Sequence, residues 1–187
     1  MERYFAALAQ LTELSPGTEQ AIADVLQRME LAKGHVLVRK NTICDYLYFI
    51  ENGLTRTFYY KHGKDVTDWI SAENSFAVSI LSFITRQTDR RIIELLEPSV
   101  IWAIHYNDFE NLCKNYHDFE RLGRHLCASG LVQLQKKFDD LHFATARERY
   151  ETLMQKNPTI IQRVPLGMIA SYLGITQETL SRIRSQI

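Results

Sequence analysis

The sequence lacks the features of a membrane protein and of a disulfide-rich secreted protein. No uninterrupted apolar run approaches the roughly 18 residues that a membrane-spanning helix needs, and the first residues do not open a signal peptide. The three cysteines, Cys44, Cys113 and Cys127, are far apart, which fits neither a disulfide framework nor a Cys-x-x-Cys metal site. We therefore expect a globular cytoplasmic protein whose thiols are free and buried.

Net charge is also absent, because 22 basic and 22 acidic side chains cancel. Overall charge therefore does not predict a polyanionic partner. The distribution is uneven, however: residues 142–187 contain six basic and three acidic side chains, a net charge of +3, so the preceding 141 residues carry −3. This excess of positive charge near the C-terminal end indicates where a nucleic acid would bind.

The N-terminal part of the sequence predicts a helix followed by a β-roll or barrel. Ser15-Pro16 is a helix start, with Ser as N-cap and Pro in the first turn, and we expect this helix to lead the fold. β-type runs then follow Lys33-Gly34, at Val36–Arg39, Tyr46–Ile50, Leu54–Tyr60, Val66–Ile70, Ile92–Leu96 and Val100–Ile104. Asn52-Gly53 and His62-Gly63 break them into a hairpin meander, and Asn-Gly favours the positive φ angles of a tight turn. We therefore expect a hairpin around Asn52-Gly53.

Two helices are expected next, the first capped by Asn107-Asp108 and the second a long helix at residues 118–142. The long helix carries a heptad seam with spacing 4, 3, 4, 3, made of Cys127, Leu131, Leu134, Phe138 and Leu141. A second apolar stripe consists of Phe119, Leu122 and Leu126. We expect one stripe to pack on the β-roll and the other on a second copy of the chain, with Gly130 allowing close approach. The alternative is that both stripes belong to the chain's own core.

Residues 166–183 have the pattern of a helix-turn-helix. Apolar residues recur where two short helices would share a core, Ala170 is small where they would cross, and Gly174 suits the sharp turn. Thr176 is expected to cap the second helix, whose inner face would contain Leu180, Ile183 and Ile187. The outward face and its flank would present Gln177, Glu178, Ser181, Arg182, Arg184 and Ser185, which are suited to base edges and phosphates.

The whole chain resembles the Crp/Fnr superfamily of bacterial transcription regulators, in particular its short members typical of Bacteroidetes. The resemblance rests on Lys33-Gly34 and on residues 45–53, 63–67 and 169–182. It implies an α+β fold with a cyclic-nucleotide-binding-like, jelly-roll-like sensor domain at residues 1–117, a dimerisation helix at 118–142 and a helix-turn-helix domain at 143–187. It also implies a homodimer that reads an inverted repeat in double-stranded DNA, an unidentified small-molecule effector, and RNA polymerase as a further partner.

Within the helix-turn-helix, Glu178 and Arg182 match the base-reading positions of the family, and Gln177 stands where relatives often have Arg. We expect Arg182 and Glu178 to carry most specificity. Gln177, Thr179 and Ser181 are expected to contact phosphates or adenine, and Arg184 with Arg163 to supply attraction that is independent of sequence.

The sequence departs from the family's pattern in two respects, the first against its cyclic-AMP binders and the second against its longer members, which carry a wing. The Gly-Glu pair and the following Arg-Ser/Thr of the cyclic-AMP binders have no counterpart in residues 74–80 and 88–92. Only Arg90 and Arg91 are candidate anion ligands there, and the equal alternative is that both are exposed loop residues without a ligand role. The effector is therefore not expected to be cyclic AMP. The sequence also ends at Ile187, so no β-hairpin wing is expected after the recognition helix.

Two alternatives from other functional classes stay open. One is a small-molecule sensor that acts through protein contacts without binding DNA. The other is a cupin-like metal enzyme, which the β-rich texture permits but which needs clustered ligands, and the six histidines form no His-x-His pair. A Gly-x-Ser-x-Gly elbow and a Gly-rich phosphate loop are absent as well. We therefore expect no enzyme activity, metal or cofactor.

Overall fold

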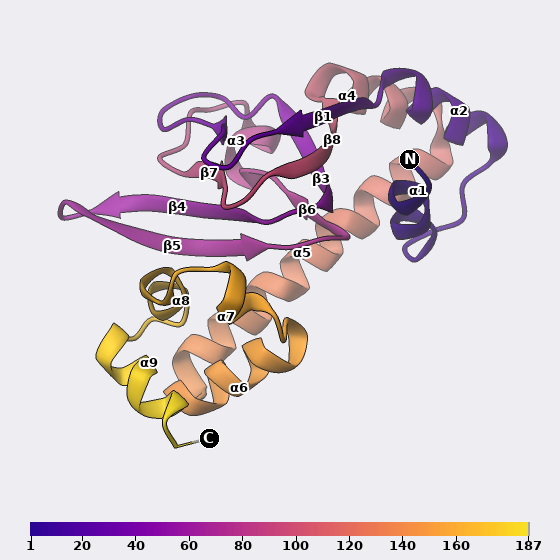
Figure 1. The fold of residues 1–187 in the computed structure, drawn as a ribbon. Helices are drawn as coiled ribbons and strands as arrows, with labels where there is room; N and C mark the ends of the chain where they lie inside the picture. Colours follow the sequence, from indigo (N-terminus) through magenta and orange to yellow (C-terminus); the bar gives the residue numbers. More distant parts are fainter. Residues whose placement is uncertain (187) are drawn as a thin grey trace.

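The structure is an α+β fold in which a β-roll and a group of C-terminal helices lie along one long helix (Figure 1). The computed structural model describes residues 1–186, so Ile187, expected on the inner face of the last helix, lies outside the described residues. The strands are β1 (Gln27–Leu31), β2 (Val36–Val38), β3 (Tyr46–Asn52), β4 (Thr55–Lys61), β5 (Lys64–Ser71), β6 (Ser75–Ala77), β7 (Ile92–Leu95) and β8 (Ser99–His105). The helices are α1 (Glu2–Ala9), α2 (Pro16–Val25), α3 (Ile80–Thr85), α4 (Tyr106–Asn115), α5 (His117–Phe143), α6 (Ala146–Lys156), α7 (Ile160–Arg163), α8 (Leu166–Tyr172) and α9 (Gln177–Arg184).

The strands form two four-stranded antiparallel sheets with the orders β1-β8-β3-β6 and β2-β7-β4-β5. Most neighbours within each sheet are distant in sequence, as in a jelly roll. Between the sheets lies an apolar core that includes Ile50, Ile93, Leu95 and Ile101, each almost completely buried. The expected jelly-roll-like domain is therefore confirmed, whereas the expected meander of consecutive hairpins is wrong.

The chain makes its tight hairpin at His62-Gly63 and not at Asn52-Gly53. β4 and β5 pair across His62-Gly63, whose φ angles of 50° and 75° suit a two-residue type I′ turn. At Asn52-Gly53 only the glycine has a positive φ, 109°, and the strands on either side belong to different sheets. A Cβ on Gly53 would lie 2.1 Å from Ser99 Oγ, so the close approach of β8 requires this glycine.

Two helices precede the roll instead of the one expected. α1, with Tyr4 and Leu8 buried, packs in the same apolar cluster as Ile22 of α2. Ser15 and Pro16 begin α2 as predicted. In contrast, the cap of α4 is His105, whose Nδ1 accepts a hydrogen bond of 3.1 Å from the Asn107 amide, so the expected cap at Asn107-Asp108 is wrong by two residues or more.

Asp118 ties α2 to the start of the long helix. Its carboxylate accepts hydrogen bonds from the Ser15 amide (2.8 Å) and the Thr18 hydroxyl (2.6 Å). Burial would raise the pKa of Asp118, but these hydrogen bonds outweigh that effect and lower the pKa to about 2. The carboxylate therefore holds the N-terminal helices against α5 in its charged form.

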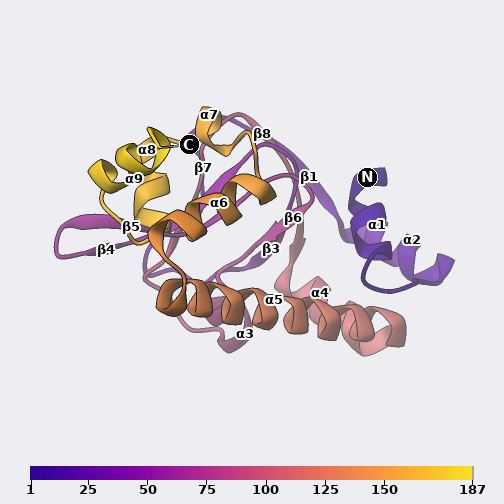
Figure 2. The same ribbon diagram turned by 90° about the horizontal axis from the view of Figure 1, so that it is seen from below.

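Figure 2 shows α5 as one long continuous helix that passes below the strands of the roll. Its two apolar stripes have different surroundings. Phe119 and Leu122 are buried and pack, with the half-buried Leu126, in the cluster that contains Phe49 and Trp102 of the roll. The seam is exposed in the single chain, with exposed fractions of 68% for Leu131, 58% for Leu134, 52% for Phe138 and 43% for Leu141. The alternative that both stripes belong to the chain's own core is therefore wrong.

The cysteines are free, but only Cys44 is buried as expected, since Cys113 is partly exposed and Cys127 lies exposed on the seam.

As for membrane insertion, no helix in residues 1–186 combines the length and the apolar character that crossing a bilayer would require.

Candidate nucleic-acid interface

The helix-turn-helix expected from the sequence is formed by α8 and α9. Gly174, at the turn, has a φ of 67°, the left-handed conformation that favours glycine. The Thr176 hydroxyl accepts a hydrogen bond of 3.2 Å from the Thr179 amide and caps α9. Leu180 and Ile169 are fully buried between the two helices. The orientation of α9 is therefore set by a local turn, a cap and a small apolar core.

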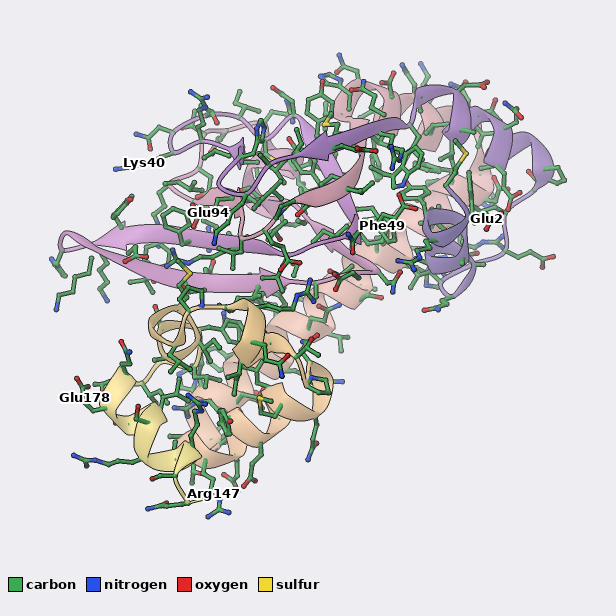
Figure 3. All side chains as sticks on the ribbon, viewed as in Figure 1. Glu2, Lys40, Phe49, Glu94, Arg147 and Glu178 are labelled. Carbon is green, nitrogen blue, oxygen red and sulfur yellow. The ribbon has the colours of Figure 1, made fainter. Side chains whose placement is uncertain are left out.

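The outward face of α9 is free. The exposed side chains are those of Gln177, Glu178, Ser181, Arg182, Arg184 and Ser185, whereas Thr179 is half-buried. Figure 3 shows Glu178 on the side of α9 that points away from the roll and α5. A hydrogen bond from its own backbone amide at the helix start, with one from Thr176, lowers the pKa of Glu178, so this carboxylate is an acceptor at neutral pH. One acceptor and two guanidinium groups thus share an accessible helix face.

Arg149 holds the turn in place, a role that the sequence did not reveal. From α6 its guanidinium donates to the backbone carbonyl of Leu173 at the end of α8 (2.9 Å) and to that of Ala144 at the end of α5 (2.5 Å). These groups belong to the helix ends, where carbonyls lack intrahelical donors. One arginine therefore connects the long helix to the helix-turn-helix. A capping box of Thr145 and Glu148 starts α6 beside it.

The helix-turn-helix is docked directly on the β-roll. The amide of Thr67, on the edge strand β5, donates a hydrogen bond of 2.9 Å to Ser171 Oγ on α8. Trp69 of β5 and Tyr172 of α8 meet edge to face with ring centroids 6.5 Å apart. Leu54 of the roll belongs to the same apolar cluster as the residues of the helical domain. This contact between segments about a hundred residues apart in sequence fixes where α9 lies relative to the β-roll.

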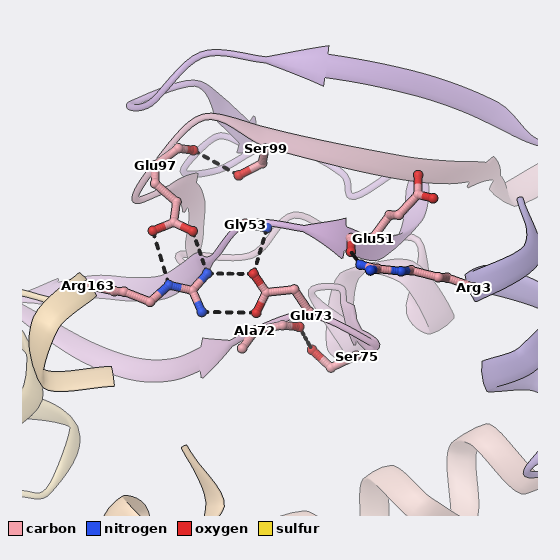
Figure 4. A network of polar contacts seen from close by, with 9 residues as sticks. All are labelled: Arg3, Glu51, Gly53, Ala72, Glu73, Ser75, Glu97, Ser99 and Arg163. Carbon is pink, nitrogen blue, oxygen red and sulfur yellow. Dashed lines mark hydrogen bonds and ion pairs between the residues drawn. The ribbon is translucent and has the colours of Figure 1, made fainter. Parts of the chain in front are cut away.

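Arg163, at the end of α7, contacts the roll and not the surface around α9 (Figure 4). Its guanidinium donates to both carboxylate oxygens of Glu73, at 3.0 and 2.6 Å, and to Glu97, at 3.3 Å and in a second, shorter contact. The hydrogen bonds that Arg163 donates to the carboxylates of Glu97 and Glu73 raise its pKa. The expectation that Arg163 contacts phosphates is therefore revised, because two carboxylates already occupy its guanidinium in this arrangement. We call these three residues the Arg163 clamp.

The two candidate anion ligands of the roll do not converge. Arg91 donates to Asp68 (2.7 Å) and to Asp89 (3.2 Å), whereas Arg90 is exposed and lies over the Tyr59 ring, 4.9 Å from its centroid. Asp89 is buried and also accepts from Ser79 (2.6 Å). Burial would raise the pKa of Asp89, but the hydrogen bonds from Ser79 and Arg91 outweigh it and lower that pKa. An internal carboxylate therefore neutralises Arg91, the better-placed cation.

The side chains that commonly bind metals are scattered. Within residues 1–186, no three His, Cys, Asp or Glu side chains gather in an arrangement that would hold a metal ion.

Comparison with known proteins identifies the fold. Residues 28–116 match the family described as cyclic nucleotide-binding domain. The chain is similar to the structure of FixK2 from Bradyrhizobium japonicum, with 17% identity, coverage of 87% of this chain and 84% of the other, and a TM-score of 0.74. A putative Crp/Fnr-family transcriptional regulator from Eubacterium rectale gives 17% identity, coverage of 91% and 82%, and a TM-score of 0.69. The catabolite activator protein of Thermus thermophilus gives 18% identity, coverage of 96% of this chain and 85% of the other, and a TM-score of 0.59.

No curated protein matches the sequence. The family match covers most of the β-roll, and the structural similarities extend from the roll through α5 into the C-terminal helices. The chain thus has the fold of the Crp/Fnr regulators, and its residues 28–116 match the cyclic nucleotide-binding domain family.

Proposed function

We propose that the protein is a homodimeric transcription regulator that binds a specific DNA sequence through α9. The observation that carries this proposal is the α8–α9 unit, in which the apolar face is buried and a polar face with two arginines is left free. A recognition helix needs this combination, because it enters the major groove with one face while the other holds it to the domain.

The side chains of α9 have different roles in this proposal. Arg182 makes a bidentate contact to guanine O6 and N7, and Glu178 accepts from a cytosine amino group. Gln177, Ser181 and the half-buried Thr179 contact phosphates or adenine. Arg184 supplies salt-sensitive attraction that does not depend on sequence. Arg163 is not part of this surface.

The seam of α5 is the proposed dimer interface. Four large apolar side chains that are more than two fifths exposed lie along one helix face, and Cys127 continues it. Such a face is costly in water and matches a copy of itself in a parallel coiled coil. A Cβ on Gly130 would have open space around it, with no other segment of the described chain within 4 Å, which leaves room there for a second helix. The dimer places two α9 helices so that they read an inverted repeat, with half-sites one DNA turn apart, about 34 Å, or a multiple of it.

The β-roll is proposed to sense a small molecule other than cyclic AMP. A cyclic phosphate needs free amides and an unpaired guanidinium. Arg91 is paired with two aspartates and Arg90 points to Tyr59, so neither offers that contact without rearrangement.

DNA reading is tested by site selection with the full-length protein, followed by titration at several salt concentrations. Arg182→Ala is expected to cost about 1–3 kcal/mol on the selected site and to remove the preference at one symmetric base position. Arg184→Ala is the matched control, because it removes the same charge from the same helix and should weaken all sequences alike. If Arg182→Ala leaves affinity and preference intact, α9 is not the reading helix. If the wild type shows no salt-dependent affinity for any DNA, the protein acts as a sensor through protein contacts.

Dimerisation is tested by sedimentation of Leu134→Asp. This change would bury a charge in each half of the seam, at a cost of several kcal/mol unless the helices separate. The variant is therefore expected to be a monomer at micromolar concentration. Gln133→Asp, one residue away and outside the seam, adds the same charge and should stay dimeric. A dimeric Leu134→Asp protein would contradict the proposed interface.

A further inference from the structure

The end of the β4–β5 hairpin carries paired positive charges next to the proposed reading helix. The hairpin ends in the two-residue turn His62-Gly63, and its last pair places Lys61 directly opposite Lys64. All four of these residues are exposed. Figure 3 shows side chains with nitrogen tips at this end of the hairpin.

The charge of the two lysines is not balanced within the protein. The nearest acidic residue in sequence, Asp65, is paired with the buried Arg56, and that hydrogen bond lowers the pKa of Asp65. Neither lysine makes an ion pair with any residue in the described part of the chain. Like charges directly opposite each other in a hairpin are destabilising. An anion held between Lys61 and Lys64 would relieve this repulsion.

The hairpin and α9 lie at the same end of the molecule. In Figures 1 and 2 the free end of β4 and β5 extends past α8 on the side where α9 lies. The two are also mechanically connected. β5 is held to α8 by the hydrogen bond from Thr67 to Ser171 and by the contact of Trp69 with Tyr172, and α8 is packed on α9. The hairpin and the reading helix therefore form one unit in this arrangement.

From this placement we infer that the tip of the β4–β5 hairpin is a second DNA contact, in which Lys61 and Lys64 bind phosphates that flank each half-site. The inference rests on the proposed function. It assigns DNA contact to the sensor domain, outside the helix-turn-helix. The contact is made to the sugar-phosphate backbone and carries no sequence information, because lysine ammonium groups act as point charges on flexible stems.

The test compares the variant Lys61→Gln/Lys64→Gln with the wild type on the site selected for the wild type. The control Lys114→Gln/Arg121→Gln removes the same charge from exposed positions on α4 and α5, at the opposite end of the molecule. Each phosphate contact contributes about 0.9 to the slope of log K against log salt. With up to four lysine contacts per dimer, the hairpin variant should lose about 2 to 4 from that slope and bind about 10- to 100-fold more weakly near 0.1 M salt.

Two further readouts separate the hairpin from the reading helix. Site selection with the hairpin variant should return the same sequence as with the wild type, since only backbone contacts are lost. On a duplex trimmed to the ends of the two half-sites, wild type and hairpin variant should bind equally, because the flanking phosphates are missing. If the wild type binds its site but the hairpin variant keeps the affinity and salt slope of the control, the hairpin inference is wrong and the proposed function stands. If the wild type binds no DNA, both fail.

Discussion

The Arg163 clamp is expected to stabilise the docking of the helix-turn-helix on the roll. Arg163→Met keeps an apolar stem and removes the guanidinium, leaving the Glu73 and Glu97 carboxylates facing each other. The three side chains are 24, 26 and 28% exposed. This degree of exposure places the clamp between exposed ion pairs, which contribute up to about 1 kcal/mol, and buried charged hydrogen bonds, which contribute about 1.5–3 kcal/mol. We therefore expect docking to weaken by about 2 kcal/mol, which corresponds to about a 30-fold shift in the equilibrium.

Hydrogen exchange at the Thr67 amide reports this equilibrium, because that amide on an edge strand donates to Ser171 only when the domains are docked. Arg163→Met should accelerate its exchange by about the same 30-fold factor. Arg147→Met is the control, since Arg147 pairs with Glu151 inside α6 and does not contact the roll. If exchange at Thr67 is equal in the two variants, apolar packing alone holds the domains together and the clamp contributes nothing.

Three further predictions concern stability and ligand binding. Asp118→Asn should lower the free energy of unfolding by about 1 kcal/mol at pH 7. Because the pKa of Asp118 is lowered from 3.8 to about 2, this stabilisation is complete above pH 3.8 and is lost as the pH falls through about 2, so denaturant titrations of wild type and variant should converge at low pH. Gly174→Ala should cost about 1–2 kcal/mol in thermal unfolding, because its φ is 67° and a Cβ would lie 3.3 Å from Leu141 Cδ2, whereas Gly17→Ala, with open space around it, should be neutral or stabilising. Calorimetry should show no micromolar binding of cyclic AMP, and a micromolar dissociation constant that Arg91→Gln abolishes would mean that Arg91 leaves its aspartates for the phosphate.

Local rules predicted the parts of the fold that depend on neighbours in sequence. The turn at Gly174 and the cap at Thr176 follow from residues within one helical turn, and the structure has both. The heptad spacing also predicted a separate apolar stripe on α5, because this spacing is visible within the sequence of the helix itself, and the stripe is exposed in the single chain. Whether a segment is a helix was therefore predicted correctly where the apolar spacing repeats along it, as in α5 and α9.

Prediction failed where the deciding contact was distant. Asn-Gly is a good turn pair, yet Gly53 is needed for the approach of Ser99 and the hairpin forms at His62-Gly63. β1, β6 and α3 were not expected at all, since each is short and its strand pairing or packing comes from remote segments. Arg163 was expected to contribute attraction to DNA because it belongs to the positively charged C-terminal segment. Its partners Glu73 and Glu97 lie 90 and 66 residues away, beyond the reach of any local pattern.

The docked arrangement also limits how the roll is able to control DNA binding in the proposed dimer. The contacts with the roll are made by α7 and by Ser171 and Tyr172 of α8, while the outward face of α9 stays exposed. Docking therefore does not mask the reading surface. Docking sets the position of each α9 relative to the roll. Because the roll is joined to α5, docking also sets the distance between the two α9 helices of a dimer. Since two-fold readers bind only when that distance matches the half-site spacing, a ligand that shifts the roll against α8 would act on spacing rather than on access.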